Sequence, residues 1–323
     1  MLDFFQDIGG FIMAPLYYVI SAMLVGFHKV WGGVFGPETG AAWVLSIICL
    51  TLVIRILLIP LFVKQIKSSR NMQLIQPKVK ELQKKYGHDK EKLAQETMAL
   101  YRETGTNPFA SCLPILLQMP IFLALFRLID QAAKHPETER GIMTVTLNEQ
   151  FGDAVFLGAK ISDTFLDTDL LGVRVLAAVL VVAMTATTFL TQRQLMSKNM
   201  PADALTGPYA QQQKLLLYVL PLVFAVGGIA FPVGVLFYWT TSNLWTMGQQ
   251  FYVIRNNPAP GTPAFKAKEQ RDKAKAARKG LPPEAAVNAQ DHAVDEIASA
   301  EAARKAAQRQ QPKRQTRSQR RKR

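Results

Sequence analysis

The stretch from Trp43 to Val63, WVLSIICLTLVIRILLIPLFV, constrains the fold more than any other part of the chain. Its 21 residues are apolar apart from a few small polar side chains and one arginine, Arg55. A helix of this length can cross the ~30 Å hydrocarbon layer of a membrane. An arginine well inside such a helix is unfavourable by roughly 2.5–3.5 kcal/mol on translocon-based scales. The sequence therefore predicts a spanning helix in which Arg55 has a function that outweighs this unfavourable free energy.

Five apolar runs predict an all-α, polytopic membrane protein with a core of five transmembrane helices. The runs cover residues 43–63, 109–129, 171–190, 215–231 and 233–253. Lysines and arginines follow the first run, whereas the loop 130–170 is acidic. Because positive loops stay in the cytoplasm, we expect this loop and the N-terminus outside the cell and the C-terminus in the cytoplasm.

Two further segments are expected to be helical. The N-terminal segment 1–40 contains the apolar residues 11–31, which are long enough to span but carry aromatic and basic side chains typical of an interfacial helix lying on the outer leaflet. We favour the interfacial interpretation and keep the spanning one open. Residues 65–104 show two amphipathic, charged patterns joined at Gly87, which predicts a cytoplasmic antiparallel helical hairpin between the first two spans.

The basic charge of the chain is concentrated at its C-terminal end. Residues 255–323 hold 18 Lys and Arg against 7 Asp and Glu, so they account for +11 of the formal net charge of +14. Their polar, Ala-rich composition predicts a disordered cytoplasmic tail that follows a core of residues 41–254. Such a tail is attracted to anionic lipid or to nucleic acid.

The sequence contains no set of residues typical of an enzyme. The motifs GxxxxGK[ST], GxSxG and HExxH are absent, and the four histidines are scattered over different segments. We therefore predict no catalytic residues, no cofactor and no metal site.

Polar side chains inside the apolar runs are the candidate binding residues. Thr51 and Arg55 lie on one helical face because they are four residues apart, and Gln118 lies midway along the second span. The last span carries the remaining candidates, Tyr238, Trp239, Ser242 and Trp245. No Asp or Glu occurs in the five runs, so Arg55 has no intramembrane carboxylate partner.

Less specific interpretations exist for each candidate. Arg55 could extend to the inner membrane surface, since it lies nine residues before Lys64. The polar side chains of the last span could be hydrogen-bonding links between helices, and the two tryptophans could be packing residues.

Four segments together resemble the YidC/Oxa/Alb family of membrane protein insertases. They are IRILLIPLFVKQIKS, MQLIQPKVKELQKKYG, NPFASCLPILLQMPIFLALFR and FPVGVLFYWTTSNLWTMGQQ, in the family's order and spacing over about residues 40–254. The large extracytoplasmic domain of the proteobacterial members is missing, so the chain resembles the Gram-positive or actinobacterial type.

The resemblance implies a function and a set of partners. It implies an insertase and chaperone that integrates membrane proteins without nucleotide hydrolysis, through a hydrophilic groove made positive by Arg55. The groove positions carry over to Thr51, Gln118 and Trp239, with Tyr238, Ser242 and Trp245 nearby. The implied partners are nascent membrane proteins, the ribosome and its rRNA through the basic tail, the Sec translocon, the signal recognition particle machinery and membrane lipids.

Two other classes of function remain open from the residues alone. Arg55 could serve a small-anion transporter or channel, although neither an inverted repeat nor a second intramembrane charge supports this. The chain could also be a membrane scaffold whose polar stripes only join helices.

Overall fold

The structure is a computed structural model, which describes residues 2–105, 113–200, 208–259 and 261–280. It is almost entirely helical, with one two-stranded antiparallel hairpin. The elements in chain order are α1 (Leu2–Phe35), α2 (Gly40–Leu57), α3 (Ile59–Tyr86), α4 (Lys90–Glu103), α5 (Leu113–Lys134), α6 (Val145–Asp153), β1 (Val155–Phe156), β2 (Ala159–Lys160), α7 (Leu171–Asn199), α8 (Pro208–Gly228), α9 (Val233–Asn256) and α10 (Pro263–Arg278).

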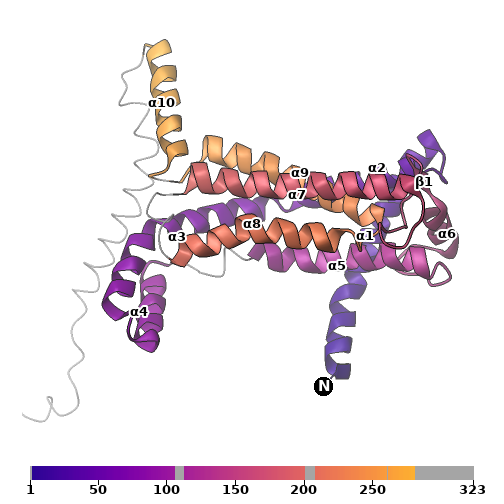
Figure 1. Cartoon of the computed structure of the whole chain (residues 1–323), viewed down its shortest axis with the longest axis horizontal. Coiled ribbons are helices and arrows are strands. Elements are labelled where there is room, and N and C mark those ends of the chain that lie inside the picture. The colour runs from indigo at the N-terminus through magenta and orange to yellow at the C-terminus, as the bar shows by residue number, and fades with distance from the viewer. Residues whose placement is uncertain (1, 106–112, 201–207, 260, 281–323) are drawn as a thin grey trace, which may run out of the picture.

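Five long helices run lengthwise beside one another in two layers (Figure 1). Helices α2, α7 and α9 form one layer, and α5 and α8 form the other. Helix α9 packs against α7 and α2, so it lies at the centre of the bundle. The core consists of large apolar side chains that are almost completely buried, among them Trp43, Ile47, Leu125 and Leu236.

Three helices in the described part of the chain are long and apolar enough to cross a membrane: Met13–Phe35, Gly40–Leu57 and Leu171–Asn199. Helix α8 contributes a shorter apolar segment, Lys214–Gly228. The polar side chains of α9 lower its hydropathy, which suits a helix surrounded by other helices rather than by lipid. These features fit the predicted polytopic membrane protein.

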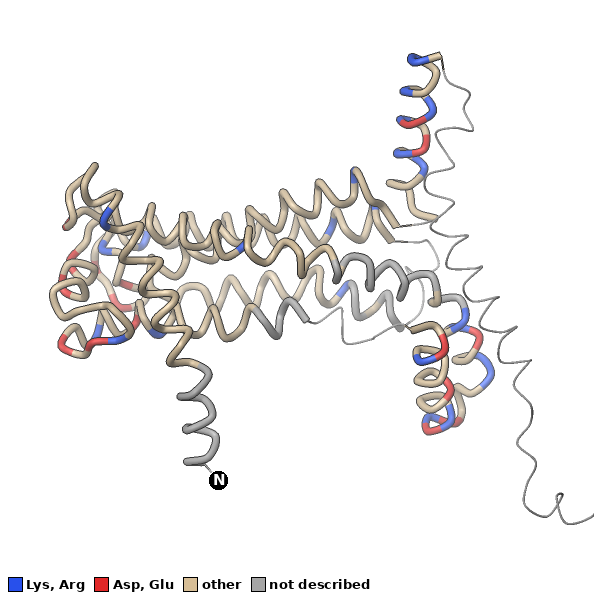
Figure 2. The backbone as a smooth tube through the Cα atoms, turned by 180° about the vertical axis from the view of Figure 1, so that it is seen from behind, with Lys and Arg blue, Asp and Glu red and all other residues tan. Residues whose placement is uncertain are grey.

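Charged side chains gather at the two ends of the bundle (Figure 2). One end carries α6 and the β hairpin, and we call it the loop end; the other carries α3, α4 and α10, and we call it the hairpin end. The long helices between these ends carry few charged residues. This distribution is the one expected when a bundle crosses an apolar layer with both ends in water.

Helix α1 runs steeply across the bundle near the loop end (Figures 1 and 2). The Ser21 hydroxyl accepts a hydrogen bond of 2.9 Å from the backbone N–H of Ile142, in the loop that follows α5. Two turns later, the His28 ring stacks on Trp43 at the start of α2, with 3.6 Å between the ring centroids. Residues two turns apart on α1 thus both contact the loop end, and Met13–Phe35 is also long enough to span, so both interpretations of 11–31 stay open.

The apolar run 43–63 is divided between two helices. Helix α2 ends at Leu57, and α3 begins at Ile59 with Pro60 in its first turn. Proline has no N–H and its ring clashes with the carbonyl four residues earlier, so it interrupts a helix. The backbone N–H of Leu58 still donates to Ile54 and its C=O still accepts from Phe62, so the interruption is local.

The predicted hairpin of 65–104 is present as α3 and α4, which pack against each other. Asp89 caps the N-terminus of α4 by accepting a 3.0 Å hydrogen bond from the backbone N–H of Lys92. A short turn joins the fourth and fifth apolar runs, since α8 ends at Gly228 and α9 begins at Val233.

The prediction of a disordered tail from residue 255 is wrong for part of that segment. Helix α9 continues to Asn256, and Pro263–Arg278 forms α10. Thr262 caps α10, Pro263 occupies its first turn, and Lys273 pairs with Glu269 one turn apart at 2.6 Å. The cap, the proline and the ion pair favour a helix locally, although the average composition of the segment favours disorder.

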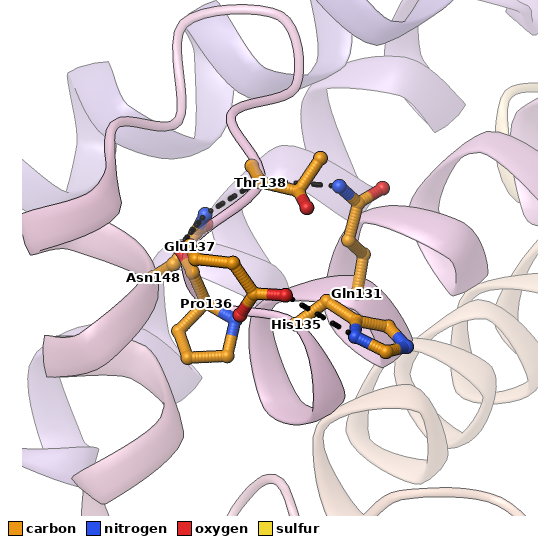
Figure 3. Close-up of polar contacts among 6 residues, drawn as sticks. All are labelled: Gln131, His135, Pro136, Glu137, Thr138 and Asn148. Carbon is orange, nitrogen blue, oxygen red and sulfur yellow. Dashed lines mark hydrogen bonds and ion pairs between the residues drawn. The ribbon is translucent and has the colours of Figure 1, made fainter.

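The loop 130–170 is a folded cap over the loop end. Asn148 of α6 donates from Nδ2 to the carbonyls of Pro136 and Thr138, both at 3.1 Å, and Gln131 of α5 donates to the same Thr138 carbonyl (Figure 3). The side chain of His135 contacts Glu137 at 3.4 Å in the same turn. The cap is attached to α9 because Gly234 N–H donates to the Ile161 carbonyl at 2.8 Å.

We expect Asp163 to make the stability of this cap depend on pH. Burial raises the pKa of the Asp163 carboxyl above its usual range, and Lys160 partly opposes the shift. The folded state therefore keeps this proton at pH values where the unfolded state has lost it, so the stability that Asp163 contributes falls as pH rises through the raised pKa. Thermal unfolding of the detergent-solubilised protein should show this decline, and Asp163→Asn should reduce it. Asp169→Asn, an exposed carboxylate near Arg174, is the control. An unchanged slope in Asp163→Asn would contradict the expectation.

Candidate functional site

Arg55 lies in the last turn of α2 and points into the bundle. Only 9% of its surface is exposed, and its Nη2 atom donates a hydrogen bond to the Ser242 hydroxyl on α9. The alternative in which Arg55 extends to the membrane surface is not the conformation found. No ion pair recorded among the described residues includes Arg55, so its nearest bonded partner is a neutral hydroxyl.

Gln118 and Tyr238 form a second polar pair next to the first. The Gln118 side chain on α5 donates from Nε2 to the Tyr238 hydroxyl, and Tyr238 is 3% exposed. The Oε1 atom of Gln118 is buried without a hydrogen-bond partner. Tyr238 and Ser242 are four residues apart on α9, so they lie on one face of that helix. The structure thus brings α2, α5 and α9 together at two consecutive turns of α9.

Thr51 lies on the same face of α2 as Arg55, one turn earlier. It is 1% exposed, and its hydroxyl donates to the Ile47 carbonyl at 2.7 Å. Because the donor is used within its own helix, Thr51 offers mainly the lone pairs of its oxygen to the interior of the bundle.

The two tryptophans of the last span have different surroundings. Trp239 belongs to an aromatic cluster, with ring centroids 4.9 Å from Phe224 and 5.2 Å from Phe122. Trp245 donates from its ring nitrogen to Gln249 of the same helix at 3.1 Å. Neither tryptophan has a recorded contact with Arg55, so the packing interpretation fits Trp239 as well as the binding one does.

Asn243 supports the interpretation in which part of α9 joins helices. Its Nδ2 atom donates to the Thr188 hydroxyl at 2.9 Å and to the Met184 carbonyl at 3.3 Å, both on α7. The polar side chains of α9 therefore serve two directions: Asn243 bonds to α7, whereas Tyr238 and Ser242 bond to α5 and α2.

Phe62 is a neighbour of Arg55 that the sequence analysis missed. The centre of the Arg55 guanidinium lies 5.8 Å from the Phe62 ring centroid, which is within the range of a cation–π interaction. Phe62 follows Arg55 by seven residues, a spacing of two helical turns, and this was the available signal.

The groups gathered at this site are suited to hydrogen bonding and to pairing with an anion. In the described part of the chain, no group of three His, Cys, Asp or Glu side chains could hold a metal ion. The site offers a cation, hydroxyls and an amide oxygen, which can receive polar or acidic groups.

Comparison with known proteins identifies a family. Residues 34–260 match the family described as 60Kd inner membrane protein. Proteins named "Membrane protein insertase YidC" from Streptomyces avermitilis, Tropheryma whipplei and Mycobacterium tuberculosis are 48%, 36% and 34% identical over 272, 288 and 268 residues. These matches cover 81%, 84% and 74% of this chain and 62%, 91% and 72% of the relatives.

A solved structure is also similar, the one titled "Active YidC insertase crystal structure with the first transmembrane domain resolved". It is 26% identical, with a TM-score of 0.45, and the match covers 72% of this chain and 46% of that one. This chain thus spans less than two thirds of the Streptomyces relative and less than half of the solved chain.

The sequence relatives confirm the resemblance, and with it the predictions of a non-enzyme and of a multi-pass bacterial membrane protein. From the family match over residues 34–260 and the identity to the Tropheryma relative across 91% of its length, we conclude that the chain belongs to the YidC family of membrane protein insertases.

Proposed function

We propose that this protein integrates nascent membrane proteins into the bacterial plasma membrane, and that Arg55 receives the polar end of the incoming segment. The observation that carries the proposal is a buried guanidinium in the middle of the bundle whose bonded partner is the neutral Ser242 hydroxyl. Buried cations are ordinarily paired with an anion, so this one is available to an acidic group that arrives from another chain.

The neighbouring groups fit the same role. The buried Gln118 oxygen without a partner can accept a hydrogen bond from a polar group of the client, and Tyr238 and Ser242 supply hydroxyls beside it. Thr51 extends this polar surface along α2, and we retain Trp239 and Trp245 as flanking contacts of the client. Together these residues form the proposed hydrophilic binding surface.

Insertion then follows from partitioning. The apolar run of the client leaves water for lipid, which supplies the net driving force. Arg55 lowers the free energy of moving acidic groups part of the way across, because Coulomb attraction at reduced dielectric reaches several kcal/mol at about 4 Å. No nucleotide hydrolysis and no covalent step are required.

The distribution of charge supports one orientation in the membrane. We assign the hairpin end to the cytoplasm because α3, α4 and α10 are rich in Lys and Arg, and the acidic loop end to the outside. This places the N-terminus outside and the C-terminus inside. In this orientation α3 and α4 can meet a client first, together with the Sec translocon or the signal recognition particle machinery.

We assign ribosome contact to the basic residues beyond α10, which lie outside the described residues. Deleting 281–323 removes many cations but leaves α10, so co-sedimentation with ribosomes should fall and its dependence on salt should weaken. The shortened protein should itself still integrate into the membrane, and the thermal unfolding of its core should stay unchanged. Equal co-sedimentation of the deleted and complete chains would remove this role from the tail.

Reconstitution of the pure protein in liposomes distinguishes the candidate functions. An insertase integrates a single-span client without ATP, and protease protection of the client's translocated end measures this. An anion transporter would move a solute instead, and a scaffold would do neither. Absence of client integration under conditions that keep the protein folded would refute the proposal.

A further inference from the structure

A cavity of about 400 Å³ lies at the hairpin end, and its lining on α9 begins at Phe251, nine residues after Ser242, the partner of Arg55. It is an open cavity bordered by the last two turns of α7 and of α9 and by residues 263–271 of α10. Its lining residues are Gln194, Lys198, Phe251, Ile254, Arg255, Pro263, Ala264, Ala267 and Arg271.

Three cations from three different helices line this cavity. Lys198 is in the last turn of α7, Arg255 in the last turn of α9, and Arg271 in the middle of α10. No Asp or Glu is among the lining residues, and the acidic residues of α10 that form ion pairs do so with Lys268 and Lys273. The cavity is therefore positive and suits an anion.

The position of α10 over the cavity is fixed by buried hydrogen bonds. Asn199 is 8% exposed and accepts a 2.8 Å hydrogen bond from the backbone N–H of Ala259. Thr262 is completely buried, donates to the Ala259 carbonyl at 2.6 Å and caps α10. Arg271 also donates from Nη2 to the Arg255 carbonyl, so the α10 side of the cavity is joined to α9.

The remaining lining is apolar and reaches the surface of the bundle. Phe251 on α9 is 53% exposed and Pro263 on α10 is exposed, whereas Ala264 is half-buried and Ile254 is buried. This surface lies where α7, a helix apolar enough to span, comes to its end. Helix α10 is oriented roughly across the long axis of the bundle at the same level (Figure 1). With the long axis of the bundle across a membrane, this orientation places α10 parallel to the membrane plane, near the ends of the long helices.

We propose that this cavity binds one anionic phospholipid, such as phosphatidylglycerol. Its phosphate is held by Lys198, Arg255 and Arg271, and one acyl chain lies against Phe251. A soluble phosphate would make no use of the exposed apolar wall. RNA would need an extended basic surface in water rather than a cavity at the membrane boundary. The site is separate from the proposed insertion surface and does not depend on it.

Native mass spectrometry of the complete chain, titrated with dioleoylphosphatidylglycerol in detergent, tests the proposal. The test variant combines Lys198→Gln and Arg255→Gln and leaves Arg271 in place. The control variant combines Lys266→Gln and Lys275→Gln. Both pairs remove two charges, and the control residues are exposed on α10 and do not line the cavity. A basic residue beside an anionic lipid contributes a factor of about five, so the first variant should weaken binding of the first lipid roughly tenfold or more. The control should change it by no more than about twofold, since its charges do not line the cavity and are screened by salt over the distance to it.

Other probes separate the possible ligands. Phosphatidylcholine should not occupy the site, and glycerol 3-phosphate and inorganic phosphate should bind much more weakly than the lipid. Equal loss of lipid binding in both variants would show that the lipid is attracted by positive charge in general, and it would refute the proposed site. Glycerol 3-phosphate binding as tightly as the lipid would assign it to soluble phosphates. Tight binding of a short RNA, lost only in the Lys198 and Arg255 variant, would assign it to nucleic acid instead.

Discussion

Replacing Arg55 with glutamate is expected to reduce insertion of clients with acidic translocated ends by roughly tenfold or more. The change puts a negative charge where the structure has a buried cation, so attraction to the client's carboxylates becomes repulsion. Arg55→Ala should give a smaller loss in the same direction. Arg55→Lys should retain most of the activity because it keeps the positive charge. Protease protection of the client in liposomes that contain the purified variant measures each effect.

Two controls separate charge from structure in this experiment. Ser242→Ala removes the hydrogen-bond partner of Arg55 but keeps the cation, so insertion should change much less than in Arg55→Ala. A client whose translocated acidic residues are replaced by their amides should be far less sensitive to Arg55→Glu. Normal insertion of the acidic client by Arg55→Glu, in a variant with unchanged thermal unfolding, would refute the electrostatic mechanism.

Replacing Gly40 with alanine is expected to destabilise the protein by about 1–3 kcal/mol. Gly40 is buried at the start of α2, where the loop-end cap lies directly against the helix. A Cβ atom there would lie 2.4 Å from the carbonyl carbon and oxygen of Val155 and 2.6 Å from the backbone nitrogen of Phe156. These are backbone atoms of β1, so they cannot move aside as a flexible side chain could. Thermal unfolding in detergent should show the loss as a lower midpoint.

Gly33→Ala is the matched control for this prediction. It makes the same chemical change in a helix, but no atom lies within 4 Å of the added Cβ. Its stability should stay the same or rise by up to about 1 kcal/mol, because alanine favours helix over glycine. Equal unfolding midpoints for Gly40→Ala and the unchanged protein would show that the cap does not pack against α2 as described.

The helical elements were largely predictable because their signals are local. Apolar runs and basic flanks indicated the long helices, and the amphipathic pattern at 65–104 indicated the hairpin now described as α3 and α4. The prediction failed where composition was used in place of local signals. Thr262 and Pro263 begin a helix within a segment whose average composition is typical of disorder.

The partners of the candidate residues were not predictable. The sequence indicated that Arg55 has no carboxylate in its own run, but not that Ser242 and Phe62 are its neighbours. It placed Tyr238 and Ser242 on one face of the last span, but not which helix that face meets. Those facts depend on how α2, α5 and α9 rotate and cross, which no periodicity within one segment records.

The sequence by itself determined that this protein crosses a membrane, that Arg55 lies among apolar residues, and that the family motifs occur in order. These properties depend on hydropathy, charge and residue type, which are features of single segments. Only the tertiary structure decided that Arg55 is buried against α9, that α1 crosses the loop end, and that Lys198, Arg255 and Arg271 surround one cavity. The physical reason is that these three cations come from separate helices, and only the packing of those helices brings them together.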